Sequence, residues 1–209
     1  MANLTLPFFI FSILSLTAFA ATAATTTTAA TATATSTNNF IQTKCSCTAY
    51  PTVCVQALSS YANKIHKSPR QLAQTALIVT LAKARYAKSY IAHLAQSNGL
   101  RPKEIGSVKD CLEVIGDTVD RLSKSVREFQ AAARCGPEEF LWHMSNVQTW
   151  ASAALTNENT CVDGFQDQGA NNGRVQIAIK GQLEGVMQCT SNALALVNQF
   201  ANKYSPKHV

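Results

Sequence analysis

The residues of this chain best suited to covalent chemistry are its seven cysteines. So many cysteines predict disulfide bonds formed in an oxidising compartment, and their odd number leaves at least one thiol free or paired between molecules. Cys45 and Cys47 are close enough to suggest a metal site, but no matching pair of Cys or His follows, so we expect neither a metal nor a cofactor. Cys189 follows the apolar Val186 by about one helical turn and is expected to be a buried thiol. The pattern assigns no pairing state to Cys47 or Cys135.

The other side chains that could support catalysis do not form a recognisable site. Asp117 and Asp120 would lie on one helix face, and glycoside hydrolysis uses a pair of carboxylates. Such a pair on a helix is more often part of a solvated surface. The sequence has no Gly-rich phosphate loop and no HExxH pattern. The four histidines are scattered and belong to no motif with a nucleophile and an orienting acid: His66, His93, His143 and His208. We therefore predict a binding protein, with an enzyme as the weaker hypothesis.

The start of the chain predicts secretion. Leu4 to Phe19 is an uncharged apolar run that ends in small residues around Ala20. This pattern is typical of a cleaved signal peptide over residues 1–20, with cleavage as late as residue 24. The run is too short and too rich in Ser and Thr to be a membrane anchor. Residues 21–37 are almost entirely Ala and Thr and predict a disordered tail.

The formal charge of +6 is unevenly distributed. Residues 44–109 contain ten Lys or Arg and a single acid, Glu104, whereas residues 110–209 contain eight basic and eleven acidic residues. A secreted cation of this kind is expected to meet a polyanionic cell-wall polymer or an acidic protein surface rather than nucleic acid. A basic face that is merely solvated is an equal alternative.

Four segments of the chain predict long helices. Apolar and small residues recur in them at alternating spacings of four and three. Ser68-Pro69 begins the first helix, Gly136-Pro137 separates the second from the third, and the loop Gly169–Gly173 precedes the fourth. The expected core positions extend to Ala133 in the second helix and to Tyr204 in the fourth. This spacing with short connections predicts an all-α, up-down-up-down four-helix bundle.

The third helix has a composition that favours protein binding. No Lys, Arg, Asp or Glu occurs from Phe140 to Asn157, although half of any bundle helix faces outward. Small uncharged hydrogen-bonding residues suit a surface that loses its water to a partner at modest cost. The alternative is that this helix is more buried than the others. The expected outward positions are Ser145, Asn146, Thr149, Ser152 and Thr156.

Three stretches resemble the plant family of invertase and pectin methylesterase inhibitors. They are Cys45-Ser-Cys-Thr-Ala-Tyr-Pro-Thr-Val-Cys54, Lys-Asp-Cys111-Leu-Glu, and Ser152-Ala-Ala-Leu-Thr-Asn-Glu-Asn-Thr-Cys161-Val-Asp-Gly-Phe165. The resemblance implies an N-terminal helical hairpin outside the bundle, and the disulfides Cys45–Cys54 and Cys111–Cys161. It covers nearly everything after the leader, so we expect an inhibitor domain over 38–209, divided into the hairpin at 38–67 and the bundle at 68–204.

The resemblance also implies a target enzyme in the apoplast, either a pectin methylesterase or an acid invertase. Invertase inhibitors of this family often carry Pro-Lys-Phe near the start of the third bundle helix. Here the corresponding residues are Pro137-Glu138-Glu139-Phe140, so two acids replace the cation. This difference favours pectin methylesterase, blocked by a reversible one-to-one complex over its pectin cleft. An invertase inhibitor and a non-inhibitory apoplastic binding protein remain the alternatives, and de-esterified pectin is a further expected electrostatic contact.

The family's polar contacts with pectin methylesterase come from the bundle helices. Carried over to this chain, they give candidate partner-binding residues on the second and third bundle helices: Glu113, Asp117, Asp120, Asn146, Thr149, Thr156 and Thr160.

Overall fold

The structure, a computed structural model, describes residues 36–97, 99–165 and 173–204. The predicted signal peptide at 1–20 lies outside these residues, as does most of the predicted tail at 21–37. The last two tail residues, Ser36 and Thr37, belong to a helical stretch over residues 36–45. The disordered-tail prediction is wrong for these two residues, because Thr37 is buried with only 2% exposure. No helix of the described part is long and apolar enough to cross a membrane.

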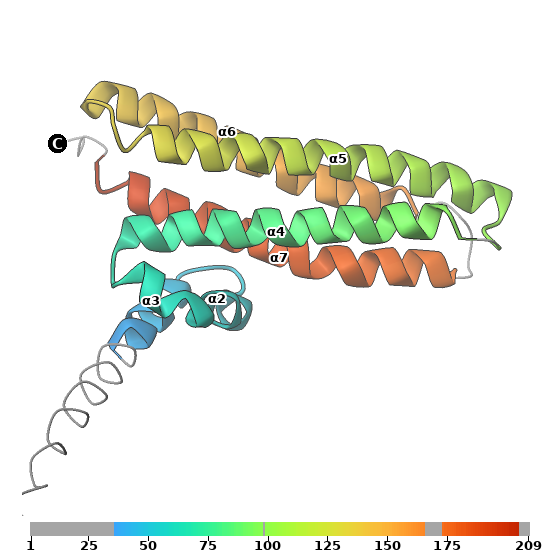
Figure 1. Cartoon of the computed structure of the whole chain (residues 1–209), viewed down its shortest axis with the longest axis horizontal. Helices are drawn as coiled ribbons and strands as arrows, with labels where there is room; N and C mark the ends of the chain where they lie inside the picture. Colours follow the sequence, from blue (N-terminus) through green and yellow to red (C-terminus); the bar gives the residue numbers. More distant parts are fainter. Residues whose placement is uncertain (1–35, 98, 166–172, 205–209) are drawn as a thin grey trace, which may run out of the picture. The chain divides into compact units, whose positions relative to one another are not determined.

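Four long helices form the predicted bundle. They are α4 (Pro69–Ala95), α5 (Pro102–Ala131), α6 (Pro137–Asp163) and α7 (Arg174–Ala201). Figure 1 shows them side by side, with successive helices running in opposite directions. α4 packs against α5 and α7, and α6 packs against the same two helices. The prediction of an all-α, up-down-up-down bundle is confirmed.

Local sequence explains where these helices begin. The Ser68 hydroxyl accepts a hydrogen bond from the Gln71 N–H at 3.3 Å, and Pro69 occupies the first turn. Before α5, the Glu104 carboxylate accepts the Arg101 N–H at 2.8 Å and pairs with its guanidinium at 2.7 Å. Gly173, which precedes α7, lies against this pair: a Cβ there would be 2.8 Å from Glu104 Oε1. A side chain at Gly173 would therefore displace the ends of the Arg101 and Glu104 side chains.

The expected core positions are mostly buried. Leu77, Ile115 and Leu183, for example, have 0–1% exposure. The prediction is wrong at the helix ends, where Ala133 is exposed and Tyr204 is 58% exposed. α5 ends at Ala131 and α7 at Ala201, so both residues follow the ends of their helices. The Tyr204 ring is still packed, with its centroid 4.7 Å from that of Phe140 and 5.4 Å from that of Phe200.

The N-terminal extension packs on α4 and α7 (Figure 1). After residues 36–45 it consists of α2 (Pro51–Leu58), the 3-10 turn η1 (Ser59–Tyr61) and α3 (Ala62–Ile65). Its apolar side chains join the same buried cluster as the near end of the bundle. The Asn192 side chain of α7 also bonds to both the N–H and the carbonyl of Tyr50, at 3.0 and 2.9 Å. The extension is therefore held to the bundle by hydrogen bonds as well as by apolar packing.

Both predicted disulfides are present. Cys45–Cys54 closes the extension, and Cys111–Cys161 joins α5 to α6, with Cα–Cα distances of 5.6 and 4.6 Å. Cys47, Cys135 and Cys189 are free thiols. Cys189 is buried, as predicted.

Candidate protein-binding face

α5 and α6, which carry all the predicted partner-binding residues, are tightly joined. Besides the Cys111–Cys161 disulfide, two fully buried hydroxyl groups lie at their contact. Thr118 Oγ1 is 3.5 Å from the Ala154 carbonyl, and Ser125 Oγ is 3.4 Å from the Val147 carbonyl. Each hydroxyl also reaches a carbonyl one turn back in α5, so neither is buried without a partner. Small side chains at these positions let the two backbones approach closely.

The acidic residues of α5 form a solvent-exposed stripe. Glu113, Asp117 and Asp120 are all exposed and follow one another at helical spacing, as predicted. The stripe extends by a further turn to Asp110, which the sequence analysis did not select. None of the four forms an ion pair with another described residue. The stripe is therefore a source of negative potential on α5.

The outer face of α6 is uncharged. Ser145, Thr149, Ser152 and Thr156 are exposed, and so is Thr160. The Thr156 hydroxyl donates to the Ser152 carbonyl at 3.2 Å, and the Thr160 hydroxyl donates to the Thr156 carbonyl at 2.9 Å. Because these two donors are already satisfied within the helix, covering them with a partner surface leaves no hydrogen unpaired.

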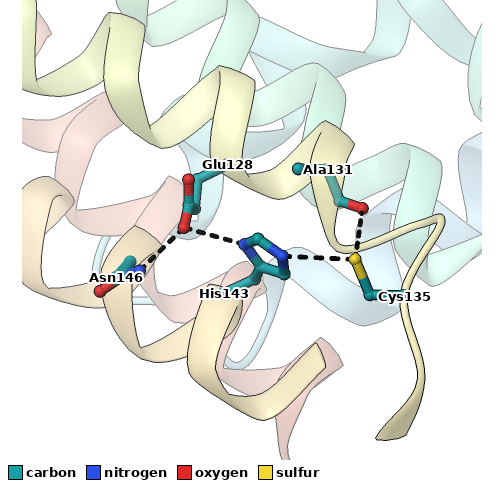
Figure 2. Close-up of polar contacts among 5 residues, drawn as sticks. All are labelled: Glu128, Ala131, Cys135, His143 and Asn146. Carbon is teal, nitrogen blue, oxygen red and sulfur yellow. Dashed lines mark hydrogen bonds and ion pairs between the residues drawn. The ribbon is translucent and has the colours of Figure 1, made fainter. Parts of the chain in front are cut away.

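Asn146 does not point outward as expected. It is half-buried, and its Nδ2 donates to Glu128 Oε1 at 2.8 Å. His143 Nδ1 lies 2.9 Å from the same oxygen, and its Nε2 lies 3.3 Å from the Cys135 sulfur (Figure 2). Asn146 therefore helps to fix α6 on α5. A signal for this contact exists in the sequence, because Glu128 and Asn146 lie at similar distances on either side of the Gly136–Pro137 turn.

The contacts around His143 are accompanied by shifted pKa values at Glu128 and Cys135. Burial acts to raise the pKa of Glu128, but hydrogen bonds from Asn146 and His143 outweigh it and hold this pKa below its usual range. Burial raises the pKa of the Cys135 thiol, and the neighbouring Glu139 carboxylate raises it further. Cys135 therefore stays protonated, which does not favour reactivity as a nucleophile.

Two tryptophans lie on α6 near this cluster. Trp142 is 62% exposed and falls one turn before Ser145 on the uncharged outer face. Trp150 is half-buried, and Lys124 Nζ lies 6.0 Å from its ring centroid. Large exposed aromatic residues are enriched at protein interfaces, so Trp142 is a partner-binding candidate that the sequence analysis passed over.

The start of α6 presents acids where invertase inhibitors carry a cation. Glu138 and Glu139 are exposed in the first turn, where carboxylates favour the helix dipole. The Phe140 ring packs at the end of α7, with its centroid 5.8 Å from that of Phe200 and 4.7 Å from that of Tyr204, which follows this helix. The first turn of α6 therefore carries negative charge, and its aromatic residue, Phe140, is already packed against other rings of the protein.

No metal centre is apparent. Among the residues that the structure describes, no group of three or more His, Cys, Asp and Glu side chains could hold a metal ion.

The fold and this face define a disulfide-linked four-helix bundle with a helical extension and a surface suited to a protein partner. Residues 39–196 match the sequence model of the plant invertase/pectin methylesterase inhibitor family, and the chain belongs to this family. The chain is 49% identical to pectinesterase inhibitor 11 of Arabidopsis thaliana, over 79% of this chain and 82% of that protein. It is also 49% identical to pectinesterase inhibitor 9 of the same plant, over 81% of this chain and 84% of that protein.

A solved structure confirms the fold. The crystal structure of a mutant form of a pectin methylesterase inhibitor from Arabidopsis aligns with 74% of this chain and 92% of its own, with a TM-score of 0.58. The two sequences are 17% identical in this alignment, so the similarity speaks for the architecture alone.

Proposed function

We propose that this protein inhibits pectin methylesterase and is not itself an enzyme. The observation that carries the proposal is the 49% identity, over most of the chain, to two proteins named pectinesterase inhibitors. The inhibitor forms a reversible one-to-one complex in which the α5–α6 face covers the pectin-binding cleft. It thereby regulates the removal of methyl esters from cell-wall pectin.

The two helices contribute differently to this complex. The α5 stripe of Glu113, Asp117 and Asp120 guides association, because exposed charges at a rim affect the rate of encounter more than the final affinity. On α6, Thr149, Thr156 and Thr160 are covered by the enzyme at little cost, since small uncharged groups lose little hydration. Asn146 acts indirectly, by holding α6 against Glu128.

Pectin methylesterase is the preferred target over acid invertase. Invertase inhibitors of this family often carry a lysine that enters the acidic cleft of the enzyme. At the corresponding position this chain carries Glu138 and Glu139, both of which are exposed. Like charges placed together disfavour a complex, and the first turn of α6 contains two acids and no basic residue.

The inhibitor is proposed to be secreted into the apoplast. The uncharged leader at residues 1–20 supports this localisation. The excess of basic residues over 44–109 supports a further contact with de-esterified pectin, whose carboxylates increase as the target enzyme acts.

A titration against two enzymes tests the proposal. The purified domain is added in increasing amounts to one pectin methylesterase and to one acid invertase, and the residual activities and stoichiometry are measured. We expect saturable inhibition of the methylesterase at one equivalent and no effect on the invertase. Inhibition of invertase alone would transfer the function to that target, and inhibition of neither would support a non-inhibitory binding protein.

A further inference from the structure

A second surface of the molecule has the features of a ligand site. Where the N-terminal extension meets α4 and α7 there is an open groove of about 560 Å³. No residue of α5 or α6 is among the described residues that line it. Its polar and aromatic lining comes from α2, η1, α4 and α7: Gln56, Ser60, Tyr61, Lys83, Tyr86 and Gln182.

The groove combines aromatic rings with hydrogen-bonding groups in the way a sugar requires. Tyr86 is 67% exposed, and both it and Tyr61 line this groove. Sugar rings present apolar C–H faces that pack on such rings, while their hydroxyls need amide and hydroxyl partners. Gln56 and Gln182 offer amides from opposite elements. Gly185 has no side chain, which keeps the α7 side of the groove open.

The charge of the groove is positive. Lys83 is exposed in its wall, and Lys64 Nζ lies 5.7 Å from the centroid of the Tyr61 ring. Neither ammonium group forms an ion pair with a described residue, and none of the described lining residues is an acid. A ligand that carries carboxylates would therefore meet free cations and no opposing charge.

We propose that this groove binds a short acidic oligosaccharide made of uronate residues. Tyr61 and Tyr86 pack on the sugar faces, Gln56 and Gln182 bond to hydroxyls, and Lys83 pairs with a carboxylate. The biological ligand rests on the proposed function, because a de-esterified uronate polymer is the product of the proposed target. Since α5 and α6 do not contribute to the groove, the inhibitor could hold this polymer and leave its protein-binding face free.

Chemical-shift mapping tests the site. The isotope-labelled protein is titrated with a homogeneous, fully de-esterified oligogalacturonate at fixed ionic strength. We expect saturable shifts that are largest for the side-chain amides of Gln56 and Gln182. Tyr86→Ala should weaken binding about fivefold to tenfold through loss of ring packing. Lys83→Ser should weaken it about threefold through loss of one exposed ion pair.

Matched controls separate this site from general attraction to a polyanion. Lys88→Ser removes the same charge from another face of α4, and we expect it to leave the affinity unchanged, as Tyr86→Phe should. A fully methyl-esterified oligomer should bind more weakly than the acid. Equal losses for Lys83→Ser and Lys88→Ser, or equal binding of the ester, would overturn the proposal.

Methylesterase inhibition by the same variants provides an independent reading. Lys83→Ser and Tyr86→Ala should inhibit as well as the unchanged protein. If the wild type binds the oligomer but inhibits no methylesterase, the proposed function fails while the groove stands. If it inhibits but shows no saturable shifts, the groove proposal fails alone.

Discussion

The most unusual residue of the core is Glu158. Its side chain is fully buried between α6 and α7, where Oε1 accepts a hydrogen bond from Thr190 Oγ1 at 2.8 Å. Oε2 has no hydrogen-bond partner among the described residues. Burial raises the pKa of Glu158 to about 8, although the Thr190 hydrogen bond acts in the opposite direction. The folded protein therefore holds this carboxyl as a neutral acid at acidic and neutral pH.

This pKa makes the contribution of Glu158 to stability largest in acid. The pKa is about 8 in the folded state and 4.5 in the unfolded chain, so between these values only the folded state keeps the proton. The contribution of Glu158 to stability is complete below the lower value and declines as pH rises toward the upper one, by roughly 1.4 kcal/mol per pH unit. Glu158→Gln keeps an acceptor for Thr190 and should flatten this slope. Denaturant unfolding across this pH window measures it.

A matched variant isolates the effect of burial. Glu184→Gln removes an exposed carboxyl from α7 and should leave the slope as it is in the unchanged protein. If Glu158→Gln retains the full slope as well, then Glu158 is ionised in the folded state and the assigned protonation is wrong.

Thr149 is a better position than Asn146 for testing whether the α6 face contacts the enzyme. It is exposed near the middle of the uncharged surface, whereas Asn146 already bonds to a carboxylate that could pair with an introduced lysine. Thr149→Lys would place an unpaired cation against the enzyme and should cost about 3 kcal/mol, more than a hundredfold in Kd. Inhibition assays on a pectin methylesterase measure this loss.

The control for Thr149→Lys adds the same charge elsewhere. Ser89→Lys modifies an exposed position on α4 and should leave inhibition unchanged. Circular dichroism should show equal helicity in both variants. Full inhibition by a folded Thr149→Lys protein would mean that this part of α6 does not face the enzyme.

At the scale of the elements, the sequence predicted the helices better than the contacts between them. Spacings of four and three, with Ser68-Pro69 and Gly136-Pro137 as boundaries, were enough to place the bundle helices. The orientation of Asn146 was not predictable from the periodicity of its own helix, because it depends on Glu128 of α5. The only signal for it was the similar distance of the two residues from the Gly136–Pro137 turn. The groove was not predictable from periodicity either, because its lining comes from segments far apart in the chain. Periodicity identifies which residues are buried but not what the half-buried ones contact.

The two disulfides should contribute unequally to stability. Cys111–Cys161 spans 50 residues and joins α5 to α6, whereas Cys45–Cys54 spans 9 residues within the extension. By chain entropy, the longer loop restricts the unfolded state more, by about 4 against about 3 kcal/mol. Replacing each pair by alanines and measuring the free energy of unfolding tests this order. A larger loss for the Cys45/Cys54 replacement would show that packing of the extension outweighs loop entropy.

For the whole molecule, charge divides the surface into parts with different uses. Residues 44–109 carry ten basic residues, and their one acid, Glu104, is paired with Arg101. The acidic stripe lies on α5, beyond this segment. This division allows one protein to be attracted to an anionic polymer through its extension and α4, and to approach an enzyme through α5 and α6.

The whole-molecule prediction is therefore retention on a polygalacturonate column that falls steeply with salt. Exposed charges are screened over about 8–10 Å at physiological ionic strength, so the attraction should be lost well before the fold is affected. The double variant Lys64→Gln/Lys83→Gln, altered on the extension and α4, should elute at lower salt than Lys180→Gln/Lys203→Gln, which loses the same net charge from the C-terminal region. All four positions are exposed. Equal elution of the two variants would show that net charge alone governs retention, and retention that does not depend on salt would remove electrostatics from the explanation.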